Sequence, residues 1–175
     1  MNRLRGVVAA IGLVAVALVG TACGLRSVDY HGDWPSYDSL DVLYDRADLV
    51  VQGVLAGSST VRKLDIGDGT TMVYTVADVT VAVVFKGSAN TGQTVAVKQL
   101  GGRLDGVDYR AEAESYLSPG QTYLLFLETY EDSPASLLNP WQAQYVVDGS
   151  GGFSSSPGNA IRVSRADLTR LAGSA

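Results

Sequence analysis

The two residue types on which many catalytic and metal sites depend, cysteine and histidine, occur once each in this chain, as Cys23 and His31. A lone cysteine excludes an intramolecular disulfide. A Ser-His-Asp or Cys-His arrangement would have to use His31, which lies in a polar segment that we expect to be an exposed linker without fixed geometry. A zinc site needs more nitrogen and sulfur ligands than the chain offers. The sequence therefore predicts no metal, no cofactor and no enzyme of these classes.

Basic residues are also few, with 13 Lys and Arg against 18 Asp and Glu. If residues 1–22 are removed as a signal, Arg3 and Arg5 go with them and 11 basic side chains remain against 18 acidic ones. Nucleic acids and anionic lipid surfaces both bind clustered Lys and Arg. The composition therefore argues against nucleic acid as a partner, and it predicts a domain that stands off a membrane instead of lying on it.

Charge is missing altogether from residues 7–22, a run rich in Val, Ala and Leu that follows Arg3 and Arg5. A basic start, an apolar run and small residues before a break are typical of a secretory signal. The run is short for a membrane-spanning helix, which needs about 20 apolar residues. We therefore expect residues 1–22 to be a helical signal peptide that is removed from the mature protein.

The break after this run, Val19-Gly20-Thr21-Ala22-Cys23, resembles the lipobox of bacterial lipoproteins, although Gly20 stands where that motif more often has Leu. The resemblance implies cleavage after Ala22 and the attachment of lipid to Cys23. Two or three acyl chains hold a protein on a bilayer far better than one. The expected location is the extracytoplasmic face of the cell membrane, with the membrane as a partner through the lipid. Ordinary secretion and an uncleaved anchor are the alternatives.

The remainder divides into a polar tether at 23–35 and one domain at 36–175, which is long enough for a hydrophobic core. In the long 72–85 segment the apolar alternation is less regular before Asp78, so we expect a bend or bulge near Ala77. Short helices are expected at 36–47, with Ser36 or Ser39 as the cap, and from Ser164 onward. Apolar patterning predicts five strands, at 49–55, 72–85, 93–99, 122–128 and 143–147.

Five strands, one of them long and bent, suit a small closed barrel, because an open sheet of this size would leave two edges to protect. The 122–128 strand is apolar on both faces, so we expect it to be central and buried. The predicted fold class is mainly β: a five-stranded OB-like barrel with short flanking helices, preceded by the signal helix.

An ordered series of short motifs resembles the netrin-like domain family, which includes the tissue inhibitors of metalloproteinases. The motifs are Ala47–Val54, Tyr74–Val76, Val84–Gly87 and Gly120–Phe126. The resemblance implies an OB barrel. The animal inhibitors depend on disulfides and on a free N-terminal cysteine amine that chelates zinc. This chain has no second cysteine, and acylation would block the amine of Cys23, so inhibition of metalloproteinases is not carried over.

Aromatic side chains in or beside predicted loops are the best candidates for a binding surface, because loops over a rigid barrel often carry recognition. We place the candidate surface at Tyr109, Tyr116, Tyr130 and Trp141, on the 103–118 and 130–141 connections; Trp34 and Tyr37 are further loop aromatics. The alternative is that such side chains plug the ends of the barrel. Gly101 and Gly102 indicate a close backbone approach or a turn and not a phosphate cradle.

Carboxylates leave one enzymatic alternative open. Glu112 and Glu114 would share a strand face, and Asp105 and Asp108 are close in sequence, so a pair could hydrolyse glycosidic bonds; such a run is more often a solvated face. The Asp65–Gly69 loop lacks the ligand series of an EF-hand. The sequence thus predicts a lipid-anchored extracytoplasmic domain that binds a protein or a cell-envelope ligand. A carboxylate-dependent envelope hydrolase and a purely structural envelope lipoprotein are the alternatives.

Overall fold

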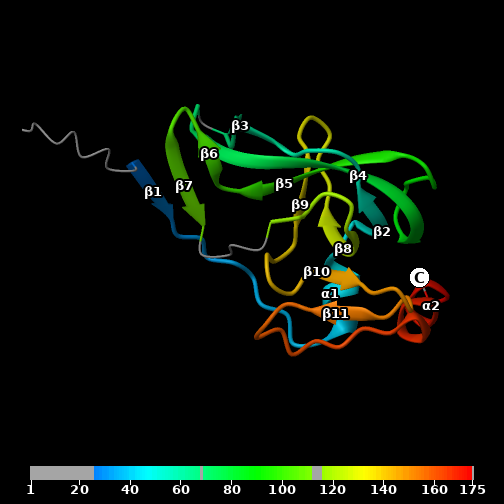
Figure 1. Cartoon of the computed structure of the whole chain (residues 1–175). Coiled ribbons are helices and arrows are strands. Elements are labelled where there is room, and N and C mark those ends of the chain that lie inside the picture. Colours follow the sequence, from blue (N-terminus) through cyan, green and yellow to red (C-terminus); the bar gives the residue numbers. More distant parts are fainter. Residues whose placement is uncertain (1–25, 68, 112–115, 175) are drawn as a thin grey trace, which may run out of the picture.

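The computed structural model of the chain describes residues 26–67, 69–111 and 116–174 (Figure 1). The predicted signal peptide, Ala22 and Cys23 lie outside the described residues. In chain order the described elements are β1 (Arg26–Tyr30), α1 (Leu40–Arg46), β2 (Leu49–Leu55), β3 (Thr60–Asp65), β4 (Thr71–Lys86), β5 (Thr94–Leu100), β6 (Gly102–Leu104), β7 (Val107–Ala111), β8 (Thr122–Glu128), β9 (Ala135–Leu137), β10 (Gln144–Val147), β11 (Phe153–Ser155) and α2 (Arg165–Ala172).

Five of these strands close into a barrel. The pairing runs β2–β4–β5–β9–β8 and returns to β2, so every barrel strand has two barrel neighbours. Only the contact between β5 and β9 is parallel, and the other four are antiparallel. If the five barrel strands are numbered along the chain, their order around the ring is first, second, third, fifth and fourth. This is an OB-like arrangement. The predicted fold class, a mainly β chain with a five-stranded OB-like barrel and short helices, is confirmed.

The fifth barrel strand differs from the one that the sequence predicts. Residues 144–147 do form a strand, β10, but it pairs with the first half of β8, before the residues that pair with β9, and with β11. The barrel is closed instead by β9, through Val97↔Ala135 on one side and Leu127↔Leu137 on the other. A strand of three residues is too short for an alternating pattern to become visible, which is why β9 was missed.

The long strand β4 is shared by three neighbours, β3, β2 and β5. The ladder between β4 and β5 is regular from Tyr74 to Thr80, so it contains no bulge at Ala77, the position at which a bend or bulge was predicted. The irregularities lie in the ladder between β4 and β2. One register shift falls between Val50 and Val51 of β2, and the other between Gln52 and Gly53. Gly53 allows the strands to approach there: a Cβ on it would lie 2.6 Å from the Val79 Cγ1 and 2.7 Å from the Thr80 carbonyl oxygen.

Strand β8 has buried side chains on both faces, as predicted. Paired residues point to the same face of a sheet, so Leu125 and Leu127 share the inner face of the barrel with the buried residues of β2 and β4. Leu124 and Phe126 point outward and are also fully buried. Figure 1 shows what covers them: β10, β11, α1 and α2 gather on one side of the barrel. The core therefore extends through the barrel wall into this outer layer.

Both helices begin at serine caps. The Ser39 hydroxyl accepts the Val42 N–H at 3.3 Å, so α1 starts at Leu40 and not at residue 36. The Ser164 hydroxyl accepts the Asp167 N–H at 3.2 Å and donates to the Asp167 carboxylate at 2.6 Å, which fixes the start of α2 as predicted. No helix among the described residues is long and apolar enough to cross a membrane.

A second sheet, of three strands in the order β1–β7–β6, stands beside the barrel. Strand β1 comes from the segment predicted to be a tether, and it pairs in parallel with β7 from Arg26↔Val107 to Tyr30↔Ala111. Five residues of mixed polar and apolar character gave no strand signal. Figure 1 shows this sheet at the end of the molecule opposite α2.

Candidate functional site

The four aromatic residues proposed from the sequence do not form one surface. Tyr109 lies on β7, and its ring stacks on that of Tyr30 with centroids 5.9 Å apart. The Tyr116 hydroxyl donates to the Leu100 carbonyl oxygen at 3.0 Å. Both line a hollow of about 470 Å³ between the small sheet and the barrel. These two rings fasten the second sheet to the barrel, which favours the structural alternative for them.

Trp141 has a structural environment of its own. Its N–H donates to the Asn139 Oδ1 at 2.8 Å, and its carbonyl oxygen accepts from the Asn159 Nδ2 at 3.2 Å. The side chain is half-buried. The residue therefore joins the loop before β10 to the loop before α2.

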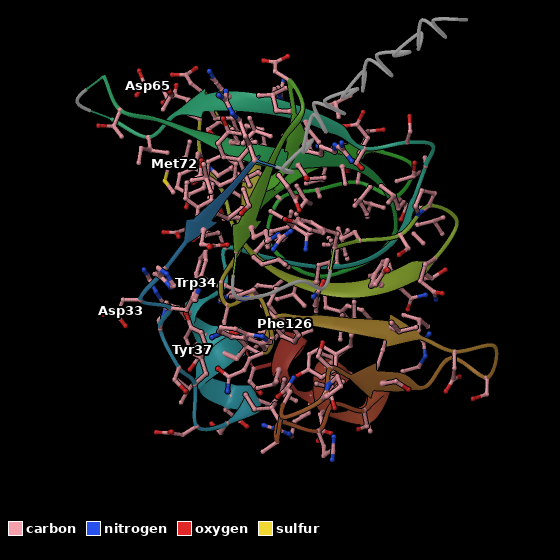
Figure 2. All side chains as sticks on the ribbon, turned by 60° about the vertical axis from the view of Figure 1, so that its left-hand side comes forward. Asp33, Trp34, Tyr37, Asp65, Met72 and Phe126 are labelled. Atoms are coloured by element: carbon pink, nitrogen blue, oxygen red, sulfur yellow. The ribbon has the colours of Figure 1, made fainter. Side chains whose placement is uncertain are left out.

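Tyr130, by contrast, lies in a groove of about 590 Å³ on the outside of the barrel, a volume within the usual range of ligand sites. We call it the aromatic groove. Its walls come from the segment before α1, the β3–β4 turn, strands β4 and β5, and the β8–β9 loop with β9. Four aromatic side chains line it: Trp34, Tyr37, Tyr74 and Tyr130. Figure 2 shows Trp34, Asp33 and Tyr37 along the side of the molecule on which Asp65 also lies.

This position is the one that OB barrels generally use for ligands. Strands β4 and β5 are the second and third strands of the barrel, and the groove is bounded by the loop between the first two strands and the loop between the last two. In the OB fold that face and those two loops bind oligonucleotides and oligosaccharides. The fold and the groove thus point independently to the same surface.

Lys98 stands at the centre of the groove. Its Nζ lies 4.3 Å from the ring centroid of Tyr130 and 5.7 Å from that of Tyr74, and it donates to the Ser133 hydroxyl at 2.9 Å. Burial lowers the pKa of Lys98, and the nearby Glu128 carboxylate partly offsets that effect. A cation held between two aromatic faces keeps both rings in place.

The rim of the groove carries both signs of charge. The Glu128 carboxylate accepts from the Tyr130 hydroxyl at 2.9 Å and lies 3.8 Å from the Arg46 guanidinium. Asp33 and Asp65 also line the groove. The groove therefore offers donors and acceptors side by side around apolar ring faces.

The loop between β9 and β10 holds the Trp34 segment against the barrel. The Tyr37 N–H donates to the Gln142 Oε1 and the Gln142 Nε2 donates back to the Tyr37 carbonyl oxygen, both at 2.9 Å. The Asn139 Nδ2 donates to the Pro35 carbonyl oxygen at 2.8 Å. The indole of Trp34 lies over Gly32, where a Cβ would be only 2.8 Å from the ring. The ring is thus positioned by its packing on Gly32 and by the hydrogen bonds that hold the backbone of Pro35 and Tyr37.

Sequence reasoning missed Tyr74 and Lys98 as site residues. Both lie within strands, and the search for binding aromatics was confined to loops. The available signal was register: Lys98 pairs with Val76 and Tyr74 with Leu100, so the two side chains are diagonal neighbours on one face. A Tyr and a Lys on the outer face of the second and third strands of an OB barrel would have marked the groove.

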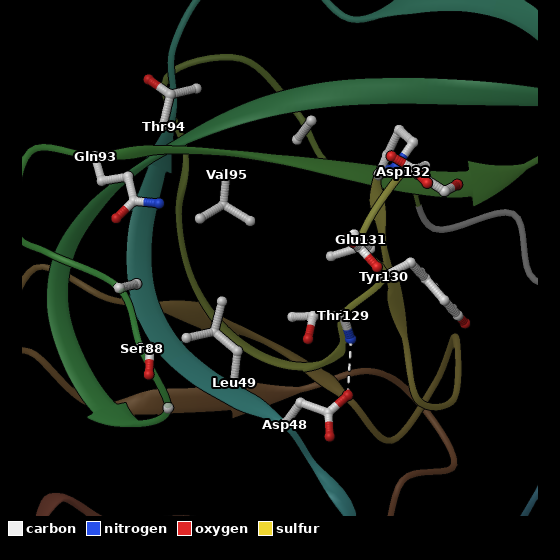
Figure 3. Close-up of a pocket in the computed structure, with 16 residues that line it drawn as sticks. Asp48, Leu49, Ser88, Gln93, Thr94, Val95, Thr129, Tyr130, Glu131 and Asp132 are labelled. Atoms are coloured by element: carbon white, nitrogen blue, oxygen red, sulfur yellow. Dashed lines mark hydrogen bonds between the residues drawn. The ribbon is translucent and has the colours of Figure 1, made fainter.

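A second hollow, of about 660 Å³, opens at the mouth of the barrel (Figure 3). Leu49 and Val95 point into it, and the Thr129 N–H donates to the Asp48 carboxylate at 2.9 Å at its edge. Tyr130 lines this hollow too, but its ring points away from the centre (Figure 3). Without aromatic faces of its own, the mouth is a weaker candidate than the aromatic groove.

The structure adds no support for the alternative that carboxylates form a hydrolase site. Glu112, Glu114 and Asp68 of the Asp65–Gly69 loop lie outside the described residues. The Asp108 carboxylate accepts from the Arg110 Nε at 2.9 Å. Asp105 occupies a tight turn at φ 50°. Within the part of the chain that the structure describes, no three His, Cys, Asp or Glu side chains gather as a metal site would require.

Burial of tyrosines predicts loss of stability at alkaline pH. Burial raises the pKa of Tyr37, Tyr74 and Tyr130 in the groove, and of Tyr44 and Tyr145 elsewhere, above 10.0. Above pH 10 the unfolded chain releases these protons before the folded one, so stability falls as pH rises. The lowered pKa of Lys98 has the opposite sign, because its folded form loses the proton first. Because five tyrosines lower the stability and Lys98 alone raises it, we expect the denaturant concentration at the unfolding midpoint to decrease above pH 10.

The measurement is near-ultraviolet absorbance against pH, in parallel with denaturation at each pH. Tyr145→Phe removes one late-ionising group, so its midpoint should fall less steeply than that of the parent chain. Ionisation of all tyrosines at the ordinary pKa in the folded protein would contradict the expectation.

Comparison with known proteins adds no relative: no protein-family model matches the chain, and no curated protein or solved structure matches it either.

Proposed function

We propose that this protein is a lipoprotein anchored through Cys23 on the extracytoplasmic face of the cell membrane, and that its barrel binds an uncharged glycan of the cell envelope. The aromatic groove carries the binding part of the proposal. The lipobox-like sequence before Cys23 supports the anchor.

Three features of the groove fit a glycan. The rings of Trp34 and Tyr74, which are half-buried, and of Tyr130, which is exposed, offer apolar surface onto which the apolar faces of sugar rings can pack. Each sugar hydroxyl both donates and accepts hydrogen bonds, and the rim supplies partners of both kinds. The groove lies on the OB face that accommodates oligosaccharides in other barrels.

Other ligand classes fit less well. A polyanion such as single-stranded nucleic acid would meet a mature chain with 18 acidic and 11 basic side chains. A peptide that adds as a strand needs a free sheet edge. The groove lies across the face of β4 and β5, whose backbone groups already pair with barrel neighbours. A glycan needs neither positive charge nor an edge.

Tryptophan fluorescence of the full chain can test the groove. Trp141→Phe leaves Trp34 as the reporter, and a detergent without sugar avoids competition. Titration with a soluble oligomer of N-acetylglucosamine should change the emission and saturate. Tyr130→Ala should weaken binding about fivefold, since a stacked aromatic contributes on the order of 1 kcal/mol. Gly32→Ala should also weaken it, because the added Cβ displaces the indole while every aromatic residue remains.

Val146→Ala is the matched control, because this exposed residue lies on β10 outside the groove lining. Equal affinities of the Tyr130→Ala and Val146→Ala chains would reject the groove as the site. A flat titration with neutral glycans would reject the ligand class, and crosslinking to envelope proteins would be the next search. The anchor is tested separately by intact mass and membrane partition: cleavage after Ala22 with added acyl mass is expected, and Cys23→Ala should leave the membrane.

A further inference from the structure

The position of β1 brings the proposed anchor close to one part of the domain. Strand β1 begins at Arg26, three residues after Cys23, a distance that an extended chain covers in at most about 11 Å. Arg26 pairs with Val107, and Val107 pairs with Leu104 across the β6–β7 turn. Leu104 and Val107, with the two turn residues between them, therefore lie beside the start of β1. We call this end of the small sheet the hairpin tip.

The small sheet cannot swing freely from the barrel, because its other end is fastened. The Tyr30 hydroxyl accepts the Val73 N–H of β4 at 3.2 Å, and the Tyr30 ring stacks on Tyr109. At the start of β6, the Gly101 N–H donates to the Val73 carbonyl oxygen at 2.8 Å. The hairpin tip and the barrel thus move as one body, with the start of β1 at the end nearest the lipid.

The chemistry of this end differs from that of the rest of the molecule. Strands β1 and β3 and the whole β6–β7 hairpin, including Asp105 in its turn, hold five basic residues and four acidic ones, whereas the rest of the mature chain holds six basic and 14 acidic. By register Arg26, Leu104 and Val107 share one face, and Val28, which is 41% exposed, shares it as well. Arg103 is exposed on the opposite face. An apolar edge with arginines on both sides suits a lipid–water interface.

We propose that the hairpin tip rests against the phospholipid headgroups, so that the anchored domain has one fixed orientation. The proposal rests on the lipid at Cys23. Its occupant is a lipid surface, because the anchor places this end within reach of the bilayer and the local charge does not oppose anionic headgroups. The net negative charge of the rest of the domain favours the same orientation, because anionic headgroups repel it.

The orientation has a consequence for the aromatic groove. Strand β1 runs away from the anchor and rises about 16 Å over its five residues. Trp34 follows its far end by four residues. The groove is therefore held about a strand's length above the headgroups, where an envelope polymer can enter it.

Quenching of a fluorescent label by headgroup-labelled nitroxide lipids tests this orientation. Once Cys23 is acylated, an introduced cysteine is the single free thiol of the chain. The lipidated full chain is placed in phosphatidylcholine–phosphatidylglycerol vesicles with the label at Leu104→Cys, on the tip, or at Gly149→Cys, where the structure leaves open space for a side chain. We expect several-fold stronger quenching at Leu104→Cys.

Charge reversal provides the matched comparison. Arg26→Glu with Arg103→Glu should reduce the quenching at the tip label, while the vesicle-bound fraction stays constant because the acyl chains are unchanged. Arg162→Glu with Arg170→Glu makes the same charge change at exposed positions outside the small sheet and should leave the quenching unaltered. Equal, weak quenching at both labels on vesicle-bound chain would overturn the contact alone. Recovery of the chain free of vesicles would overturn the contact together with the anchor.

Discussion

Replacing Gly101 by alanine should destabilise the protein by about 2–4 kcal/mol, because left-handed strain and steric overlap add. Gly101 has φ +94°, and a Cβ on it would lie 2.6 Å from the Tyr109 carbonyl oxygen and 2.5 Å from the Tyr116 hydroxyl. The tyrosine side chain can move, but the carbonyl belongs to the β7 backbone. The glycine cannot retreat, since its N–H binds Val73 and its carbonyl oxygen accepts the Thr75 hydroxyl at 2.9 Å.

Gly106→Ala is the control in the same hairpin. Gly106 has φ +78°, but a Cβ there would meet nothing within 4 Å. Only the left-handed conformation is penalised, at about 1 kcal/mol. Urea denaturation of both chains measures the difference directly, through the midpoints at constant slope. Equal costs for the two substitutions would show that β7 is free to move away from the barrel, and would remove the rigid attachment on which the membrane orientation depends.

The barrel was predictable because its main strands carry their own signals. The 122–128 run is apolar on both faces, and such a run has one place in a small barrel, against core on both sides. The strand that closes the ring was not predictable in the same way. β9 pairs with β5 and β8 through contacts that are distant in sequence, and its three residues, Ala135–Leu137, show no periodicity. The sequence determines this closure through tertiary packing and not through a local pattern.

The groove shows why loops alone were a poor guide to a site. Tyr130 was identified because it lies in a predicted loop, yet its ring contacts Lys98, which lies in the middle of β5. Tyr109 and Tyr116 have the same residue type and a similar loop context, but they stack and hydrogen-bond within the joint between the two sheets. Whether such an aromatic side chain lines the groove or joins the two sheets depends on the residues that it contacts from other strands. Those contacts depend on the pairing register of the strands, which the sequence did not predict.

Phe126→Ala should reduce stability by about 3–5 kcal/mol, a large fraction of the 5–15 kcal/mol typical of a domain. The Phe126 ring is fully buried on the outer face of β8 and meets the Tyr145 ring edge-to-face at 6.0 Å. The site cannot collapse easily, because the Tyr145 hydroxyl is held by the Asn159 Nδ2 at 3.1 Å. The lost packing is therefore left as a cavity between the barrel wall and its outer layer.

Val146→Ala tests the same layer from its exposed side. Val146 lies next to Tyr145 on β10 but is 38% exposed, so its truncation should cost about 0.5 kcal/mol or less. Thermal or urea unfolding of the two variants should show one cooperative transition each, because the core is continuous through β8. A Phe126→Ala chain that unfolds in two steps would mean that the outer layer melts separately from the barrel. Since α1 and the loop that positions Trp34 belong to that layer, such a chain would also be expected to lose the proposed glycan binding before the barrel unfolds.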